Sequence, residues 1–172
     1  MSRFLVLLLL LVASPGTYAQ RPLTQPELPR DLATGRVSYR RVVVAEAFSR
    51  AQLYARARAW VRQHQHAPAG VPVVERETLG EITAQSADTI AVRGCATAVV
   101  RHSLRFQIRE GRFQYEFTDF SAQPFGNFEN DHPTTHRRAW NQLRTNTDAQ
   151  VKRWVSSLER TMLGWEPAAG QF

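Results

Sequence analysis

"HSLRFQIREGRFQYEFTDF", residues 102–120, is the stretch that decides the fold of this chain. Apolar and polar residues alternate on both sides of Glu110-Gly111: Leu104, Phe106 and Ile108 come before this pair, and Phe113, Tyr115 and Phe117 come after it. Alternation with a period of two is typical of strands that bury one face and expose the other. Gly111 can adopt the positive φ that a tight turn between two strands needs. The stretch therefore predicts an antiparallel β-hairpin.

The polar residues around this stretch define the exposed face of the predicted hairpin. They are Arg101, Arg105, Gln107 and Arg109 on the first strand, and Gln114, Glu116 and Thr118 on the second. An ordinary solvated sheet face and a binding surface both fit this pattern. If the face binds a partner, we expect the contact to be made by Arg101, Arg105, Gln107, Arg109 and Glu116.

An amphipathic helix is predicted upstream, in residues 49–64. Ser49 and Gln52 have the spacing of a capping box, in which both side chains bond backbone N–H groups at a helix start. The apolar stripe recurs every three or four positions: Leu53, Ala57, Trp60, Val61 and His64. The arginines fall mostly on the other side, which indicates a solvated face. His64 and His66 are two residues apart and do not share a helix face, so they do not predict a metal site.

Strands are expected on both sides of this helix. β-branched and aromatic residues at 35–47 predict the first strand. Its apolar residues change parity along the segment, which predicts a bulge near Arg40 and Arg41. After the helix, turns at Gly80 and Gly94 separate further strands that lead into the hairpin.

A second, longer helix is predicted near the C-terminal end. Apolar residues keep helical spacing from Trp140 to Met162. We expect both tryptophans of this segment to be core residues. Thr147 and Gln150 form another capping-box pair, which predicts a break or kink near Asn146.

The order of these elements, a strand, a helix, three or four strands and a helix, predicts an α+β domain. We expect a curved antiparallel sheet of four to five strands with two long helices packed on one face. This single domain should span residues 35–164. An extended, proline-rich arm at 20–34 should precede it, and a tail at 165–172 should follow it.

Residues 1–19 are typical of a secretory signal peptide. A short basic start is followed by an apolar run at 4–13 and by Thr17-Tyr18-Ala19, a small-x-small cleavage signal. We expect cleavage after Ala19, and hence a periplasmic or secreted protein. About ten apolar residues are too few to cross a bilayer, which takes roughly 20 in a helix. Because Cys95 is the only cysteine, we expect neither a lipid anchor at the cleavage point nor an internal disulfide.

The chain is strongly basic, with a net charge of +7, and nearly all of its cations are arginines. In an exported protein, this charge favours an anionic envelope ligand or a protein surface over nucleic acid. A long connection at residues 122–135 adds Phe125 and Phe128, which could cap the sheet or reach a partner. We therefore expect a non-enzymatic domain that binds an unknown partner through the exposed sheet face and this loop.

Motifs of the common enzyme classes are missing from the sequence. It has no Gly-x-Ser-x-Gly elbow, phosphate loop, dinucleotide glycine fingerprint or His-Glu-x-x-His pair. His132 and His136 would share a helix face if a helix began early enough, but Pro133 opposes this, because the residue before a proline avoids helical angles. Cys95 and His102 are seven residues apart, which places them on opposite faces of a strand. We therefore expect no catalytic residue, metal or cofactor.

Two alternatives stay open at this point. One is a metal-dependent enzyme that uses His132 and His136. The other is a polyanion-binding module that uses the arginine-rich sheet face.

Four stretches of the chain carry a resemblance: LATGRVSYRRVVV, SRAQLYARARAWV, REGRFQYEFTDF and RRAWNQLRTNTDAQVKRWVSSLE. From about Leu32 to Met162, they resemble a secreted bacterial family known only as a domain of unknown function with a TATA-binding-protein-like (TBP-like) fold. The most specific pieces are packing and turn residues: Thr34-Gly35, Leu53-Tyr54, Ala57, Trp60, Gly111-Arg112 and Trp140-Asn141. The resemblance implies a TBP-like fold. It carries over no catalytic or ligand residues, and a fold alone does not fix a function.

Overall fold

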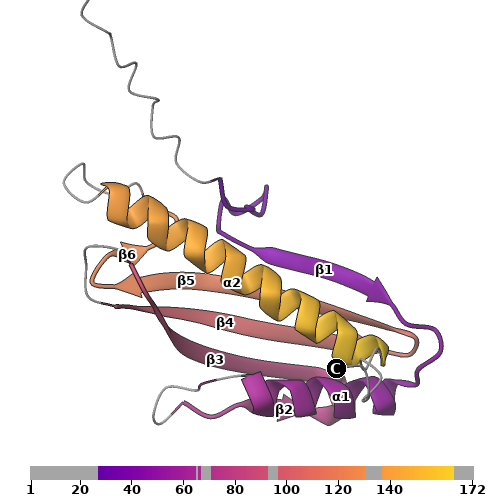
Figure 1. The fold of residues 1–172 in the computed structure, drawn as a ribbon. Coiled ribbons are helices and arrows are strands. Elements are labelled where there is room, and N and C mark those ends of the chain that lie inside the picture. The colour runs from indigo at the N-terminus through magenta and orange to yellow at the C-terminus, as the bar shows by residue number, and fades with distance from the viewer. Residues whose placement is uncertain (1–26, 65, 67–70, 93–96, 131–136, 165–172) are drawn as a thin grey trace, which may run out of the picture.

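The computed structural model describes residues 27–64, 66, 71–92, 97–130 and 137–164. In chain order, the elements are β1 (Tyr39–Val44), α1 (Arg50–His64), β2 (Val74–Arg76), the 3-10 turn η1 (Glu77–Leu79), β3 (Glu81–Ile90), β4 (Ala98–Arg109), β5 (Arg112–Gln123), β6 (Gly126–Asn127) and α2 (Arg137–Leu163). The strands form one antiparallel sheet in the order β1-β5-β4-β3-β2, and the short β6 pairs with β5 (Figure 1).

Both helices cover the same face of this sheet. Trp60 of α1 and Trp154 of α2 pack against one residue of β5, Phe117, with ring centroids 6.5 Å and 6.2 Å from it. Figure 1 shows α2 running the length of the sheet, with α1 beside β2 and β3. The predicted α+β class, with an antiparallel sheet and two helices on one face, is confirmed.

The β4–β5 hairpin has the predicted form. Arg109 and Arg112 pair directly across a two-residue turn at Glu110-Gly111. Gly111 has a φ of 65°, a conformation that residues with a Cβ rarely adopt. Its carbonyl oxygen accepts a hydrogen bond from the backbone N–H of Ala45 at 2.8 Å, which joins the turn to the end of β1. The hairpin therefore forms the middle of the sheet, with β1 on one side and β3 on the other.

α1 begins with the predicted capping box. The backbone N–H of Ser49 donates to Oε1 of Gln52 at 2.9 Å, and the backbone N–H of Gln52 donates to Oγ of Ser49 at 3.3 Å. The buried side chains of the helix are Leu53, Tyr54, Ala57, Trp60 and Val61. The predicted apolar stripe is thus confirmed, with Tyr54 added to it and with His64 only half-buried at its end.

α2 runs without interruption from Arg137 to Leu163. The break predicted near Asn146 is therefore wrong. Thr147 and Val151 are buried, so the stripe that faces the core continues through the expected break. A capping box adds about 1 kcal/mol at a helix start. The packing of an uninterrupted face contributes more, because most helix stability in proteins comes from tertiary contacts.

β1 contains no bulge. It pairs residue for residue with β5 along its whole length, so the bulge predicted near Arg40 and Arg41 is wrong. The change of parity has another cause: β1 is an edge strand, and its residues Val42 and Val44 point away from the helices, with 55% and 64% of their surface exposed. The register shift of this sheet lies instead between β4 and β5, just after Arg101.

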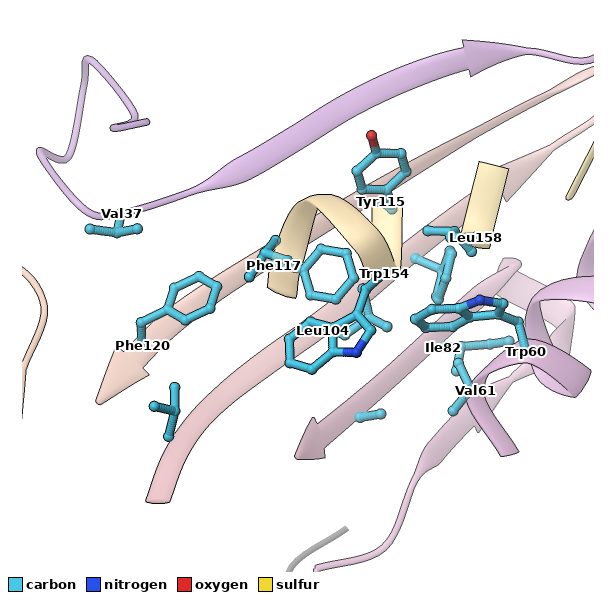
Figure 2. Close-up of a cluster of buried hydrophobic side chains, with 14 of the residues drawn as sticks. Val37, Trp60, Val61, Ile82, Leu104, Tyr115, Phe117, Phe120, Trp154 and Leu158 are labelled. Atoms are coloured by element: carbon cyan, nitrogen blue, oxygen red, sulfur yellow. The ribbon is translucent and has the colours of Figure 1, made fainter. Parts of the chain in front are cut away.

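The core lies between the sheet and the two helices, as Figure 2 shows. Trp60 is 1% exposed, and Trp154 is also buried. The prediction that Trp140 and Trp154 are core residues is confirmed. At the margin of the core, the hydroxyl of Tyr115 donates to Oε1 of Glu159 at 2.8 Å. Burial, and then this hydrogen bond, raise the pKa of Tyr115 above its usual range.

The described part of the predicted N-terminal arm is attached to the domain. Leu28 is buried in the core, and Arg30 forms an antiparallel bridge with Val37. The predicted signal peptide, the rest of the arm and the C-terminal tail lie outside the described residues. No helix in the part of the chain that the structure describes is long and apolar enough to span a membrane.

Candidate binding surface on the open sheet face

No described residue outside the sheet forms a layer on the side that faces away from the helices, and we call this side the open face. Along β4 and β5, buried residues alternate with residues that point to this side. The predicted partner-binding residues of the hairpin all lie on it: Arg101, Arg105, Gln107, Arg109 and Glu116. These side chains lie on one surface, as the alternation of apolar and polar residues along the two strands predicted.

The centre of the open face is internally paired. Nitrogen atoms of Arg105 and Arg76 lie 3.4 Å and 3.7 Å from carboxylate oxygens of Glu81. Glu116 lies directly opposite Arg105 in the strand register, and it accepts a hydrogen bond from Oγ of Ser38 at 3.3 Å. Because Glu81 offsets the charges of Arg105 and Arg76, the centre of the open face attracts anions only weakly.

The hairpin end of the open face differs, because two arginines meet there and neither forms an ion pair among the described residues. Arg109 and Arg112 lie directly opposite each other on β4 and β5, and both are exposed. Neither guanidinium group has an ion-pair or hydrogen-bond partner among the described residues. Like charges directly opposite on neighbouring strands destabilise a sheet. An anion bound between the two guanidinium groups would remove this repulsion.

A hollow of about 240 Å³ lies at the hairpin end. Both arginines line it, together with Val42 of β1 and with Gln107 and Gln114, which pair with each other one step further along the hairpin. Guanidinium and amide groups donate hydrogen bonds to carboxylate, sulfate or phosphate oxygens. The exposed methyl groups of Val42 offer an apolar contact beside them. This geometry suits an anionic group that is attached to an apolar one.

Sequence reasoning identified Gln107 and Arg109 for this site but missed Arg112 and Val42. The sequence does carry a signal for Arg112: this residue has the same parity as Gln114, so both belong on the same face of the strand. Val42 could not be found in this way. Its strand pairs with β5 through a contact between distant parts of the chain, and the sequence does not show which strands are neighbours.

The two phenylalanines that were predicted to reach a partner lie on the helix-covered side. Phe128 is fully buried, and its ring centroid lies 5.0 Å from that of Trp140 and 6.0 Å from that of Phe120. The prediction that Phe128 binds a partner is therefore wrong. Phe125 is half-buried, and its ring centroid lies 5.9 Å from that of Trp140. Burying an aromatic ring contributes roughly 1.5 to 3 kcal/mol, so both rings help to cap this end of the core. Partner binding by the exposed part of Phe125 stays a prediction.

The histidines do not gather into a metal site in the described part of the chain. No group of three or more histidine, cysteine, aspartate or glutamate side chains there is arranged to hold a metal ion. His64 bonds through Nδ1 to the carbonyl oxygen of Trp60 at 3.1 Å, whereas Nδ1 of His66 lies 3.2 Å from a carboxylate oxygen of Asp88. Other residues considered for metal or thiol chemistry lie outside the described ranges: Cys95, His132 and His136. The metal-dependent alternative therefore stays a prediction.

His102 is buried on the helix-covered face of β4. Its ring centroid lies 5.7 Å from that of Phe120 and 4.8 Å from that of Trp154. Neither ring nitrogen has a hydrogen-bond partner among the described residues, although Nδ1 lies 3.7 Å from Oδ2 of Asp88. Burial lowers the pKa of His102 to about 4, and the charge of Asp88 acts in the opposite direction without cancelling this effect. His102 is therefore neutral near pH 7.

The open antiparallel sheet with two helices on one face defines this molecule as an α+β domain with a TBP-like fold. Residues 39–123 match the model of a family described as "Domain of unknown function (DUF4468) with TBP-like fold". This match confirms the resemblance to a domain of unknown function with a TBP-like fold.

Solved structures of this fold are similar to the chain, and two of them illustrate the likeness. A TBP-like protein from Parabacteroides distasonis ATCC 8503 shares 14% sequence identity with it, with a TM-score of 0.61, over 78% of this chain and 96% of that one. A DUF4468 family protein from Bacteroides ovatus ATCC 8483 shares 12% identity, with a TM-score of 0.62, over 84% of this chain and 94% of that one. At these identities, the likeness shows the fold alone. No curated protein matches the chain.

Proposed function

We propose that the protein is an exported binding domain whose open face holds an anionic partner at the hairpin end. The observation that carries this proposal is the pairing of Arg109 with Arg112 beside a hollow, with neither guanidinium group in an ion pair among the described residues. The leader predicted at residues 1–19 supports export to the periplasm or the medium. The net charge of +7 supports the approach of an anionic partner, because a charged protein steers oppositely charged molecules toward it.

The hairpin end is a better binding site than the centre of the open face for a physical reason. A partner that binds at the centre must compete with Glu81, which already lies beside two arginines. A partner at the hairpin end displaces only water from Arg109 and Arg112. Hydrogen bonds to charged groups contribute roughly 1.5 to 3 kcal/mol each, so removing both guanidinium groups should weaken binding measurably.

The test uses heparin and poly-L-glutamate as probe anions with the chain that lacks residues 1–19. We expect the double variant Arg109→Gln/Arg112→Gln to lose at least tenfold in affinity for both probes, since it removes two charge-assisted contacts. The matched control is Arg137→Gln/Arg138→Gln, which removes the same charge from exposed positions at the start of α2. If the control loses as much affinity as the hairpin variant, net charge alone explains binding and the proposal fails.

The polyanion-binding alternative makes a different prediction on the same face. A module that binds along a long polyanion would use Arg101, Arg105 and Arg109 together. Arg101→Gln/Arg105→Gln should then weaken heparin binding as much as the hairpin variant does, with a steep dependence on salt. A site confined to the hairpin end predicts a loss of less than threefold for this variant.

Export is tested separately. Expression of the full chain in a bacterial host, followed by fractionation and N-terminal sequencing, should place the protein outside the cytoplasm with Gln20 as its first residue. An uncleaved chain in the cytoplasm would contradict export and leave the binding test unaffected.

A further inference from the structure

A second constellation lies between α1 and α2, on the side of the molecule opposite the open face. His64 comes from the last turn of α1, and Ser157 comes from α2. Oγ of Ser157 lies 3.2 Å from Nε2 of His64. The indole N–H of Trp60 donates to the same Oγ at 3.2 Å. The imidazole stacks on the indole of Trp60, with ring centroids 4.5 Å apart and planes inclined by 6°.

These hydrogen bonds determine where the protons lie. Nδ1 of His64 is 3.1 Å from the carbonyl oxygen of Trp60. A carbonyl only accepts, so Nδ1 carries the imidazole proton. Nε2 is then the acceptor, and the hydroxyl of Ser157 donates to it. The indole of Trp60 uses one lone pair of Oγ, and the other lone pair stays available for attack.

The arrangement exceeds what core packing requires. A hydrogen bond from Trp60 to Ser157 by itself satisfies the buried indole N–H. The imidazole adds a base within reach of the hydroxyl, and the carbonyl of Trp60 adds a group that orients this base. A nucleophile, a base and an orienting group within hydrogen-bond reach are the usual parts of an activated serine.

A hollow of about 540 Å³ opens over this pair. Its lining includes His64, Ser157, Trp154 and the cationic side chains of Lys152, Arg153 and Arg160. The backbone N–H groups inside α2 are used by the helix, so they cannot form an oxyanion hole. Lys152 already forms an ion pair with Asp148 at 2.7 Å, so Arg153 and Arg160 are the cations that can stabilise a developing negative charge. They also favour a substrate that is itself anionic.

We propose that Ser157 is a nucleophile activated by His64, and that it accepts acyl groups from carboxylic esters that carry a negative charge. Nε2 of His64 takes the Oγ proton while Oγ attacks the carbonyl carbon. The bond from that carbon to the alkoxy oxygen breaks, and the alcohol leaves with the proton from Nε2. Water, which gives a proton to Nε2, then attacks the acyl group, and the acid departs as Oγ regains its proton. Trp60 is a positioning residue, because its carbonyl and ring hold the imidazole.

The test uses a fluorophosphonate ester as probe, because an activated serine forms a phosphorus–oxygen bond with it and displaces fluoride. We expect the full chain to gain one adduct, mapped to Ser157 by peptide mass. Ser157→Ala should abolish the adduct, and His64→Gln should slow its formation at least a hundredfold, as expected for the loss of a general base. Ser156→Ala is the matched control, because Oγ of Ser156 already donates to the carbonyl of Lys152 at 2.9 Å. It should react like the parent.

Thermal unfolding of each variant separates loss of reactivity from loss of fold. If Ser157→Ala does not fold, Ser157→Cys provides a second test: iodoacetamide should alkylate this thiol at least tenfold faster than the thiol of Ser156→Cys. The proposal is overturned if the parent gains no adduct, if the adduct persists in Ser157→Ala, or if His64→Gln reacts at the parental rate. Arg109→Gln/Arg112→Gln should be labelled like the parent, so this site and the proposed binding site can fail independently.

Discussion

The two faces of the sheet are built from the same strands but have opposite characters. Leu104 and Phe106 of β4 are fully buried on the helix-covered face, while their neighbours Arg105 and Gln107 point to the open face. Apolar burial contributes about 25 cal/mol per Å². Exposed ion pairs contribute about 0 to 1 kcal/mol. The covered face therefore holds most of the stability, and the open face can carry binding residues at little cost to folding.

The largest expected effect tests whether stability lies on the covered face. Trp60→Ala should lower the free energy of unfolding by about 3 to 5 kcal/mol, because it leaves a cavity between α1 and the sheet. Urea denaturation followed by circular dichroism measures the change. Val42→Ala on the open face is the control, and we expect it to cost less than about 1 kcal/mol. If both variants lose a similar free energy of unfolding, the covered face does not hold most of the stability.

A change of pH should weaken the covered face through its buried imidazole. The pKa of His102 is about 4 in the folded protein, against an ordinary value of 6.5 in the unfolded chain. As the pH falls, the unfolded chain therefore binds the proton first. The contribution of His102 to stability is complete above pH 6.5 and declines toward pH 4, where the loss is about 3 kcal/mol. Urea denaturation at pH 7 and pH 4 measures it.

The control for this prediction is His102→Leu, which has no imidazole to titrate. Its free energy of unfolding should fall less between pH 7 and pH 4, by about the contribution assigned to His102. An identical pH dependence in the parent and in this variant would show that other groups cause the acid sensitivity.

The smallest expected effect on stability lies on the open face, and it is a gain, whereas the two changes above are losses. Arg112→Glu replaces a repulsive cross-strand pair by an attractive one with Arg109, so stability should rise by about 0.2 to 1 kcal/mol. The same change should abolish binding of anions at the hairpin end. Thermal unfolding and heparin binding, measured together, check both parts. A variant that is less stable than the parent, or that still binds, would show that the two arginines do not face each other as described.

The parts of the fold that depend on neighbouring residues were predictable from the sequence. The hairpin turn at Gly111 and the capping box of Ser49 and Gln52 use residues within a few positions of one another, and both are confirmed. The second capping-box pair failed, because the buried stripe around Thr147 keeps α2 continuous. Phe128 failed for a related reason: its position in a loop indicates exposure, whereas Trp140 of α2 covers it.

The candidate sites depend on contacts that the chain does not encode locally. Arg109 was identified because parity within one strand is a local property. The pair of His64 and Ser157 was missed, since 93 residues separate them and no motif has that spacing. Val42 was missed because the pairing of β1 with β5 is invisible before the sheet is assembled.

The sequence by itself determined the local elements, the side of each strand that is apolar, and the strongly basic character of the chain. These follow from periods of two and of about 3.6 residues, which set side-chain directions without reference to the rest of the molecule. Only the tertiary structure decided which strand lies beside Arg112 to complete the hollow, and which serine meets an imidazole. Such contacts depend on which strands pair and on how α1 packs against α2, and these choices minimise the exposed apolar surface of the whole chain.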